Sequence, residues 1–281
     1  MFPRTQIESL SVSRMIIGTN WFLGYSHTSA AKDQHIKSNM TVAKIADVLE
    51  VFLERGVDTI IGLIAHPTMK DAVDEAQQRT GKKIIVISSP AFNCGDSPEA
   101  LSEAERSIER VAKLGSAVCL PHTCTTDALV DVRTRKIRNM DLYCQMIRRH
   151  GMIPGLSTHM PEAPVYADES GLDVATYIQI YNAAGFLMHV EIDWVHRLIW
   201  KARHPVITIK PMAAGRLLPL VGLGFAWATI RDQDMVAVGT MTPDEARECI
   251  DISLSILDRR SNTVELQETR SKQTVLRQDK K

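Results

Sequence analysis

Short apolar runs alternate with longer segments of mixed polarity along most of the chain. Each run is nearly continuous in hydrophobicity and rich in β-branched residues, a pattern typical of parallel strands that are covered on both faces. The pattern predicts eight strands, at Met15–Thr19, Thr59–Ile64, Lys83–Ser88, Ala117–Pro121, Met152–Ser157, Ile178–Tyr181, Val206–Lys210 and Val236–Gly239. Because strand-like and helix-like segments take turns, we expect an α/β protein.

Four of the intervening segments have the features of amphipathic helices. In Thr41–Arg55 apolar residues recur at helical spacing, the threonine can cap the start, and Gly56 follows the end. Ser97–Leu114 begins with a capping serine and a proline, Ala128–His150 ends at a glycine, and Thr242–Asp258 carries acidic residues in its first turn. All four are predicted to be helices.

Eight strands separated mostly by helices are typical of a (β/α)8 TIM barrel, which forms one domain of about 250 residues. A doubly wound sheet is the competing fold, but the segment Gly18–Gly24 after the first strand contains no G-x-G-x-x-G turn. We therefore expect a single barrel over residues 1–258 and a polar C-terminal tail over residues 259–281. The tail is expected either to fray or to pack on a second copy in a homo-oligomer.

Charge and cysteine content exclude several classes of protein. The 281 residues include 33 basic and 33 acidic side chains, so the net charge is zero. A nucleic-acid binder needs a basic face, and so does a protein drawn to an acidic membrane surface; we expect neither partner. The five cysteines show no C-x-x-C spacing and are expected to be free thiols. With no secretory leader and no apolar stretch of about 18 residues, the chain is expected to be cytoplasmic. Polar residues expected at the barrel mouth, such as Asn20 and Asn182, favour a small polar molecule as the substrate.

Candidate catalytic residues follow the predicted strands, because active sites of such barrels lie at the C-terminal ends of the strands. Three histidines occupy such positions: His66, His122 and His159. Lys210 ends an otherwise apolar strand, where desolvation would lower its pKa and make it a base or a Schiff-base former.

Two loops have the composition of phosphate-binding turns. Ala213–Arg216 follows the seventh predicted strand and contains Gly215, and Arg216 could add a positive charge. Gly239 and Thr240 follow the eighth strand and lead into a helix. Free backbone N–H groups at helix N-termini bind phosphates, so both loops are candidates for cofactor binding.

Several segments together resemble the aldo-keto reductases. They match that superfamily in the same order along the chain and cover about residues 12–257: Val12–Thr19, Leu53–Asp58, Gly155–His159, Gln179–Asn182, Lys210–Gly215 and Val238–Ala246. The resemblance implies a TIM barrel and an NAD(P)-dependent oxidoreductase that acts on a small carbonyl or sugar-like substrate.

The resemblance also places the superfamily's catalytic tetrad of aspartate, tyrosine, lysine and histidine. These positions fall on Ile61, His66, Ser88 or Ser89, and His122 in this chain. Only His122 matches, so the chain is a divergent member by this resemblance, with three of the four catalytic residues replaced.

On the cofactor side, the resemblance implies that Ser157 and Gln179 contact the nicotinamide amide and that Glu248 contacts the adenine. Gly239 stands where many members have a basic residue for the adenosine 2′-phosphate. NADP is therefore less well supported than in a typical member.

Three functions remain open at this stage. In the first, a nicotinamide-dependent oxidoreductase, His66 would replace the tyrosine as proton donor and His122 would orient the carbonyl. In the second, a metal-dependent isomerase, lyase or hydrolase, the two histidines would bind a divalent ion together with His159, Glu162 or Cys124. The third is a non-catalytic barrel that binds a ligand.

Overall fold

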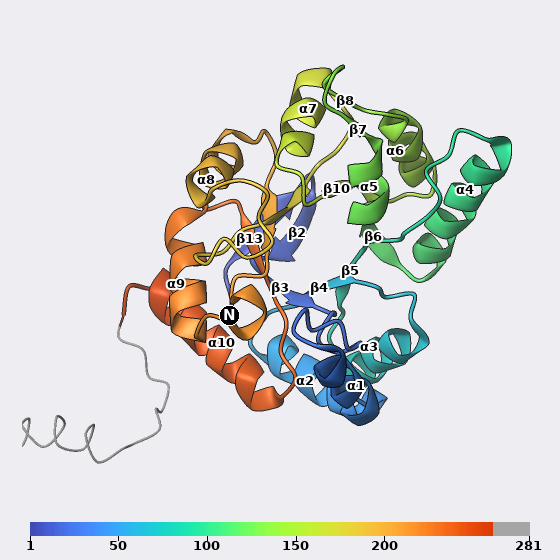
Figure 1. The fold of residues 1–281 in the computed structure, drawn as a ribbon. Helices are drawn as coiled ribbons and strands as arrows, with labels where there is room; N and C mark the ends of the chain where they lie inside the picture. The colour runs from blue at the N-terminus through green and yellow to red at the C-terminus, as the bar shows by residue number, and fades with distance from the viewer. Residues whose placement is uncertain (261–281) are drawn as a thin grey trace, which may run out of the picture.

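Eight parallel strands form a ring at the centre of the molecule, and the helices surround it (Figure 1). The computed structural model describes residues 1–260. The strands of the ring are β3 (Met15–Gly18), β4 (Thr59–Gly62), β5 (Ile85–Ser88), β6 (Ser116–Cys119), β9 (Ile153–Pro154) continued by β10 (Leu156–Ser157), β11 (Tyr177–Ile180), β12 (Val206–Ile209) and β13 (Met235–Val238). This arrangement confirms the predicted TIM barrel and the positions of all eight strands.

The ring closes at Gly155, the residue between β9 and β10. Before it, β9 pairs with β6, and after it, β10 pairs with β11. Gly155 donates its N–H to Cys119 O at 3.1 Å, whereas the Leu156 N–H turns to Thr176 O at 3.0 Å. A Cβ at position 155 would lie 2.9 Å from Thr176 O, so the close approach requires glycine.

Ten helices connect the strands or follow them in the described part of the chain. Their bounds are α1 Ala30–Asn39, α2 Val42–Glu54, α3 Pro67–Thr80, α4 Pro98–Lys113, α5 Thr123–Leu129, α6 Met140–Arg149, α7 Glu162–Ser170, α8 Ile192–Lys201, α9 Pro219–Thr229 and α10 Pro243–Leu257. Helices α2, α4 and α10 confirm three predictions. Thr41 and Ser97 cap the first turns of α2 and α4 as expected, and Thr242 caps α10, whose first turn contains the predicted acidic residues.

The predicted helix Ala128–His150 is wrong. The segment contains the end of α5, a hairpin of β7 (Val130–Asp131) and β8 (Lys136–Ile137), and then α6. The Asp131 carboxylate accepts the N–H groups of Arg133 and Thr134, which turns the backbone out of the helix. Such local side-chain bonds compete with helical bonding, and helical periodicity alone does not reveal them.

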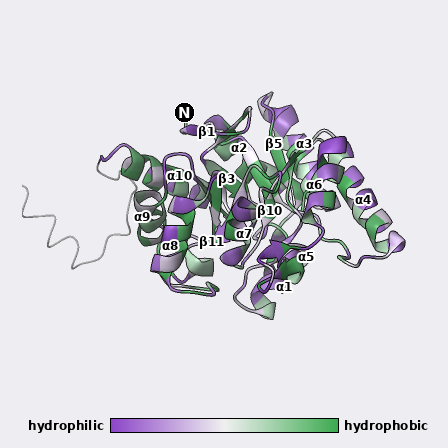
Figure 2. Ribbon diagram, turned by 90° about the horizontal axis from the view of Figure 1, so that it is seen from above, coloured by the Kyte–Doolittle hydropathy of each residue, from purple (hydrophilic) through white to green (hydrophobic). Residues whose placement is uncertain are grey.

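Apolar residues pack in two layers, one inside the ring and one between the ring and the helices. The inner layer consists of alternate strand residues such as Ile16, Ile87 and Ile207. The hairpin of β1 (Arg4–Ile7) and β2 (Leu10–Ser13) closes the amino-terminal end of the barrel and adds Ile7 and Val12 to this layer. In Figure 2 the central strands are mostly hydrophobic, and hydrophilic residues gather on the surrounding helices.

Three further expectations concern the cysteines, membrane-spanning helices and the C-terminal tail. All five cysteines carry free thiols. Among residues 1–260, none of the helices combines the length and apolarity that a membrane crossing requires. Helix α10 ends at Leu257, and the predicted tail lies outside the described residues apart from its first two positions.

Candidate functional site

A pocket of about 770 Å³ opens at the C-terminal ends of the barrel strands. Its walls come from the residues that follow β3, β4, β6, β10, β12 and β13, including Trp21, His122, His159, Lys210 and Thr240. The volume falls within the range of small-molecule and cofactor sites. The pocket is therefore the candidate active site, at the end of the barrel that the sequence indicated.

His122 follows β6 and caps the amino end of α5. Its Nδ1 accepts the backbone N–H of Cys124 at 3.3 Å, and the Cys124 thiol lies 3.1 Å from the same nitrogen. With Nδ1 acting as an acceptor, the ring proton resides on Nε2. Burial lowers the pKa of His122, assisted by the charge of Lys210 and opposed by Asp127. At neutral pH the ring is thus a neutral imidazole with an N–H to donate.

Lys210 follows β12 and reaches His27, a residue of the loop after β3. The Lys210 Nζ atom lies 3.1 Å from His27 Nε2. On the other side of the ring, His27 Nδ1 lies 3.0 Å from Tyr25 O, which can only accept, so Nδ1 carries the proton and Nε2 accepts from the lysine. Burial lowers the pKa of Lys210 to about 8. Burial also lowers the pKa of His27, and the lysine charge adds to the effect.

Non-glycine residues with left-handed backbone conformations gather at this part of the pocket. His27, Lys210 and Ala214 have φ values of 59°, 60° and 55°, and all three line the pocket. Lys210 also precedes Pro211, which further restricts its backbone. Conformations of this kind cost on the order of 1–3 kcal/mol each and are concentrated at functional sites.

Asp127 connects the two strand ends that carry His122 and His159. Its carboxylate accepts the Thr123 hydroxyl at 2.8 Å, the Thr158 hydroxyl, and the backbone N–H of His159 at 3.2 Å. Burial is the main cause that lowers the pKa of His159 to about 4, and the lysine charge contributes. His159 is therefore a second neutral imidazole on the pocket wall.

Two hydroxyl groups on the wall have no hydrogen-bond partner within residues 1–260. Ser89 Oγ and Thr240 Oγ1 are buried, and their residues are 6% and 3% exposed. Buried hydroxyls normally have a partner, because leaving one unsatisfied costs about 1–3 kcal/mol. Both groups are available to a bound ligand.

Acidic residues line the pocket where α10 begins. Glu245 and Glu248 lie on its wall, and Glu245 accepts the backbone N–H of Met241 at 2.6 Å. Next to them, Gly239 packs against the Trp21 indole: a Cβ at position 239 would lie only 2.7 Å from Trp21 Cδ1. A longer side chain at this position would require the indole to move. The acidic character of this end of the pocket comes from Glu245 and Glu248.

The pocket brings together most of the residues that the sequence singled out. It is lined by His122, His159, Lys210, Ser157, Gly215, Gly239, Thr240 and Glu248. The sequence reasoning missed His27, because the residue lies nine positions beyond β3 and only the fold of the loop returns it to Lys210.

Three predicted residues lie outside the pocket wall. His66 is exposed and precedes α3 without a side-chain capping bond. Gln179 is buried and donates to Met160 O at 3.4 Å. Arg216 donates to Ala213 O, and its guanidinium lies 4.0 Å from the Phe186 ring centroid.

The metal-site hypothesis receives no support. Residues 1–260 contain no cluster of three His, Cys, Asp or Glu side chains arranged to hold an ion. The exposed position of His66 removes one of the proposed ligands from the pocket.

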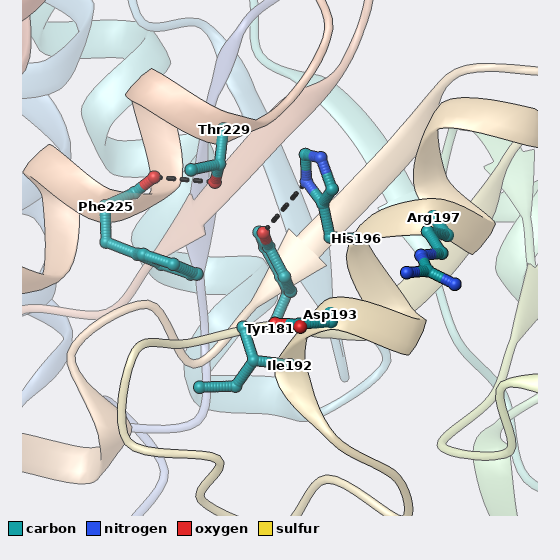
Figure 3. Close-up of a pocket in the computed structure, with 7 residues that line it drawn as sticks. All are labelled: Tyr181, Ile192, Asp193, His196, Arg197, Phe225 and Thr229. Carbon is teal, nitrogen blue, oxygen red and sulfur yellow. Dashed lines mark hydrogen bonds between the residues drawn. The ribbon is translucent and has the colours of Figure 1, made fainter.

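A second hollow of about 370 Å³ lies outside the ring, between α8 and α9 (Figure 3). In it Tyr181 and His196 form a hydrogen bond of 3.3 Å. None of the residues predicted for catalysis or cofactor binding lines this hollow. Of its seven lining residues only Tyr181 directly follows a barrel strand, β11, and the others lie on α8 and α9.

Comparison with protein families and with curated proteins finds no match. Many solved structures share the fold. One structure of an aldo-keto reductase from Pseudomonas aeruginosa, assigned by similarity, has a TM-score of 0.66 and 16% identity over 91% of this chain and 95% of that one. A glycerol dehydrogenase from Gluconobacter oxydans has a TM-score of 0.59 and 12% identity over 98% and 94% of the two chains. At these identities the similarity shows that the chain has the aldo-keto reductase fold.

Proposed function

We propose that the protein is a nicotinamide-dependent oxidoreductase, a divergent relative of the aldo-keto reductases that acts on a small carbonyl compound. The observation that carries the proposal is a single pocket that contains both His122 and the candidate cofactor residues Ser157, Gly215, Thr240 and Glu248. Fold alone is weak grounds for a function. The placement of these residues in one cavity supports the function more directly, because it shows that a cofactor and a substrate could bind beside His122.

The residues present fit a dinucleotide. Thr240 offers an unpartnered hydroxyl at the loop before α10, and Lys210 is a cation without an ion-pair partner in the described part of the chain. Ser157 would hold the nicotinamide amide, the loop around Gly215 would hold the phosphates, and Glu248 would accept from the adenosine. When bound, the nicotinamide supplies or accepts a hydride.

The acidic end of the pocket favours NAD over NADP. A 2′-phosphate placed near Glu245 and Glu248 would meet like charge, whereas carboxylates accept hydrogen bonds from ribose hydroxyls. The contact between Gly239 and Trp21 leaves no room for a basic side chain at that position.

In this proposal His122 polarises the carbonyl group and Lys210 donates the proton. The neutral His122 ring would donate its Nε2–H to the carbonyl oxygen and polarise it. The ammonium of Lys210, with a pKa of about 8, would supply the proton that the new hydroxyl needs, because an acid works best when its pKa is close to the operating pH. His66, which the sequence suggested as proton donor, does not line the pocket.

Titration with NADH and NADPH tests the proposal, with Trp21 fluorescence as the readout for binding and a Trp21→Phe variant as its control. We expect NADH to bind more tightly than NADPH. Failure of both to bind at millimolar concentration would exclude a nicotinamide enzyme.

A His122→Gln variant tests the catalytic role. We expect NADH binding to be unchanged and kcat for the reduction of small aldehydes to fall by roughly 10²-fold or more, the usual contribution of a positioned acid or donor. His150→Gln is the matched control, since His150 pairs with Glu105 outside the pocket. Equal rates for the two variants would contradict the role of His122.

A further inference from the structure

The Lys210–His27 pair joins two loops that are 183 residues apart in the sequence. Both residues line the pocket, and both have left-handed backbone conformations that side chains rarely adopt. Two residues thus have unfavourable backbone conformations, and these conformations place the lysine amine within hydrogen-bond distance of the imidazole. Such a cost is expected where an arrangement is needed for chemistry.

The hydrogen bonds orient His27 as a base toward the amine. Tyr25 O fixes the proton on Nδ1, so the lone pair of Nε2 points to Lys210 Nζ at 3.1 Å. A nucleophile, a base within hydrogen-bond distance and a third group that orients the base are the parts of an activated nucleophile.

The surroundings make the ammonium ion of Lys210 less stable than that of an exposed lysine. Among residues 1–260, none of the carboxylates forms an ion pair with Lys210. The neighbouring imidazoles of His27, His122 and His159 have lowered pKa values and are uncharged where the lysine titrates, so they offer no negative charge to stabilise an ammonium. Burial acts in the same direction and lowers the pKa of Lys210.

We propose that Lys210 is an amine nucleophile that forms an imine with a small aldehyde or ketone in the pocket, with His27 as the proton acceptor. The free amine that this step requires is a different form of the lysine from the ammonium that donates a proton in the proposed reduction. Imine formation needs no nicotinamide, so the inference goes beyond the oxidoreductase function.

The step balances without a further reactant. His27 Nε2 takes a proton from the Lys210 ammonium, and the amine lone pair forms a bond to the carbonyl carbon. The C=O π electrons move to oxygen, which takes the proton held by His27, and the nitrogen then gives one of its own two protons to His27, leaving a neutral carbinolamine. That second proton passes to the hydroxyl, which leaves as water while the nitrogen lone pair forms a C=N bond that carries the remaining N–H. The sum is an ammonium and a carbonyl converted into a protonated imine and water, and the imine can draw electrons from the adjacent carbon. No atom is oxidised or reduced, so the pocket could support lyase or isomerase chemistry on a carbonyl compound.

Reductive trapping tests the proposal on the full chain without nicotinamide. The protein is treated with limiting glycolaldehyde and cyanoborohydride, and the modified lysines are identified by peptide mass spectrometry. We expect Lys210 to be labelled about tenfold faster than the average exposed lysine, because a lowered pKa gives it a larger fraction of free amine. Labelling of Lys210 at or below the rate of the exposed lysines would overturn the proposal.

A His27→Gln variant tests the part played by the base, with His35→Gln on the exposed face of α1 as its control. We expect the first variant to label Lys210 several-fold more slowly and the second to match the wild type. Unchanged labelling in a folded His27→Gln protein would exclude His27 as the proton acceptor. The wild-type preference for Lys210 remains a test if the variant does not fold. NADH titration is a separate measurement, so either proposal can fail without the other.

Discussion

His27 and His122 show how a backbone contact decides what one side chain can do. The Nδ1 atom of His27 donates to Tyr25 O, and that of His122 accepts from Cys124 N–H. The two rings therefore hold their protons on opposite nitrogens. As a result His27 offers a lone pair to Lys210, whereas His122 offers an N–H to a ligand in the same pocket.

The pH dependence of the two lysine reactions follows from the pKa of about 8 for Lys210. Its neighbours His27, His122 and His159 have lowered pKa values and are neutral above pH 7, while Arg216 stays charged. Proton donation needs the ammonium, so kcat for reduction should fall as the pH rises through about 8. Reductive trapping needs the free amine and should speed up over the same interval. Steady-state rates and labelling rates from pH 6.5 to 9.5 check both trends, and parallel trends would contradict the assignment.

At the scale of elements, helix α9 supports the loop that carries Lys210. Gly222 of α9 faces this loop so closely that a Cβ there would lie 2.6 Å from Pro211 O and 3.1 Å from Met212 Cα. Gly224, two residues later, would meet only the Ile256 Cδ1 atom at 3.9 Å. One glycine is thus needed for packing against the loop that carries Lys210, and the other has space for a methyl group.

Substitution of each of the two glycines by alanine gives a matched pair of variants. We expect Gly222→Ala to destabilise the protein by about 1–3 kcal/mol, because the added methyl group collides with backbone atoms. Gly224→Ala should stabilise it by about 0.5–1 kcal/mol through its effect on helix propensity. Urea unfolding measures both changes. In addition, the rate of reductive trapping at Lys210 should fall only in Gly222→Ala. Equal stability of the two variants would contradict the packing argument.

At the scale of the whole molecule, a polar cluster joins the segments at the amino-terminal end of the barrel. The Asp234 side chain is fully buried and accepts Val206 N–H at 2.9 Å and the Arg231 guanidinium at 2.8 Å. Arg14, just before β3, donates to Asp234 O at 3.0 Å. The cluster therefore connects β12, β13 and the start of β3 at the end opposite the pocket.

Asp234→Ala should lower the free energy of unfolding by about 2–4 kcal/mol, because it removes the carboxylate that pairs with the partly buried Arg231 guanidinium and leaves the buried Val206 N–H without its acceptor. Asp232→Ala is the control, since that carboxylate is exposed and lies 4.0 Å from Arg14. Thermal unfolding followed by circular dichroism compares the two. Similar melting temperatures would show that the cluster does not stabilise the barrel.

Acid should destabilise the folded barrel through His159. Its pKa is about 4 in the folded chain, against an ordinary value of 6.5, so between these values the unfolded chain binds a proton that the folded chain excludes. The free energy of unfolding should therefore fall as the pH drops from 6.5 to 4, by about 1–2 kcal/mol after allowance for solvent. Urea unfolding of the wild type and His159→Gln at pH 7 and 4.5 checks this. The variant should lose less stability, and an equal loss would exclude His159 as the cause.

The eight strands and three of the four predicted helices could be identified from the sequence because short-range physics specifies them. Apolar β-branched runs such as Val206–Ile209 stay buried in any arrangement, and a capping threonine or a terminal glycine acts within a few residues. The same order of elements placed His122, His159 and Lys210 at one end of the barrel before their contacts were known.

Tertiary structure decided which side chains share the pocket. His66 and His27 both occur in loops after strands, yet the first is exposed and the second contacts a lysine 183 residues away. That difference depends on how two loops fold over the barrel, and no local pattern encodes it. The hairpin between α5 and α6 has a different, local cause, since the Asp131 carboxylate binds the backbone two and three residues ahead, and helical periodicity does not show it. Periodicity in the sequence determined the barrel, and long-range packing determined the orientation and protonation of the groups at its mouth.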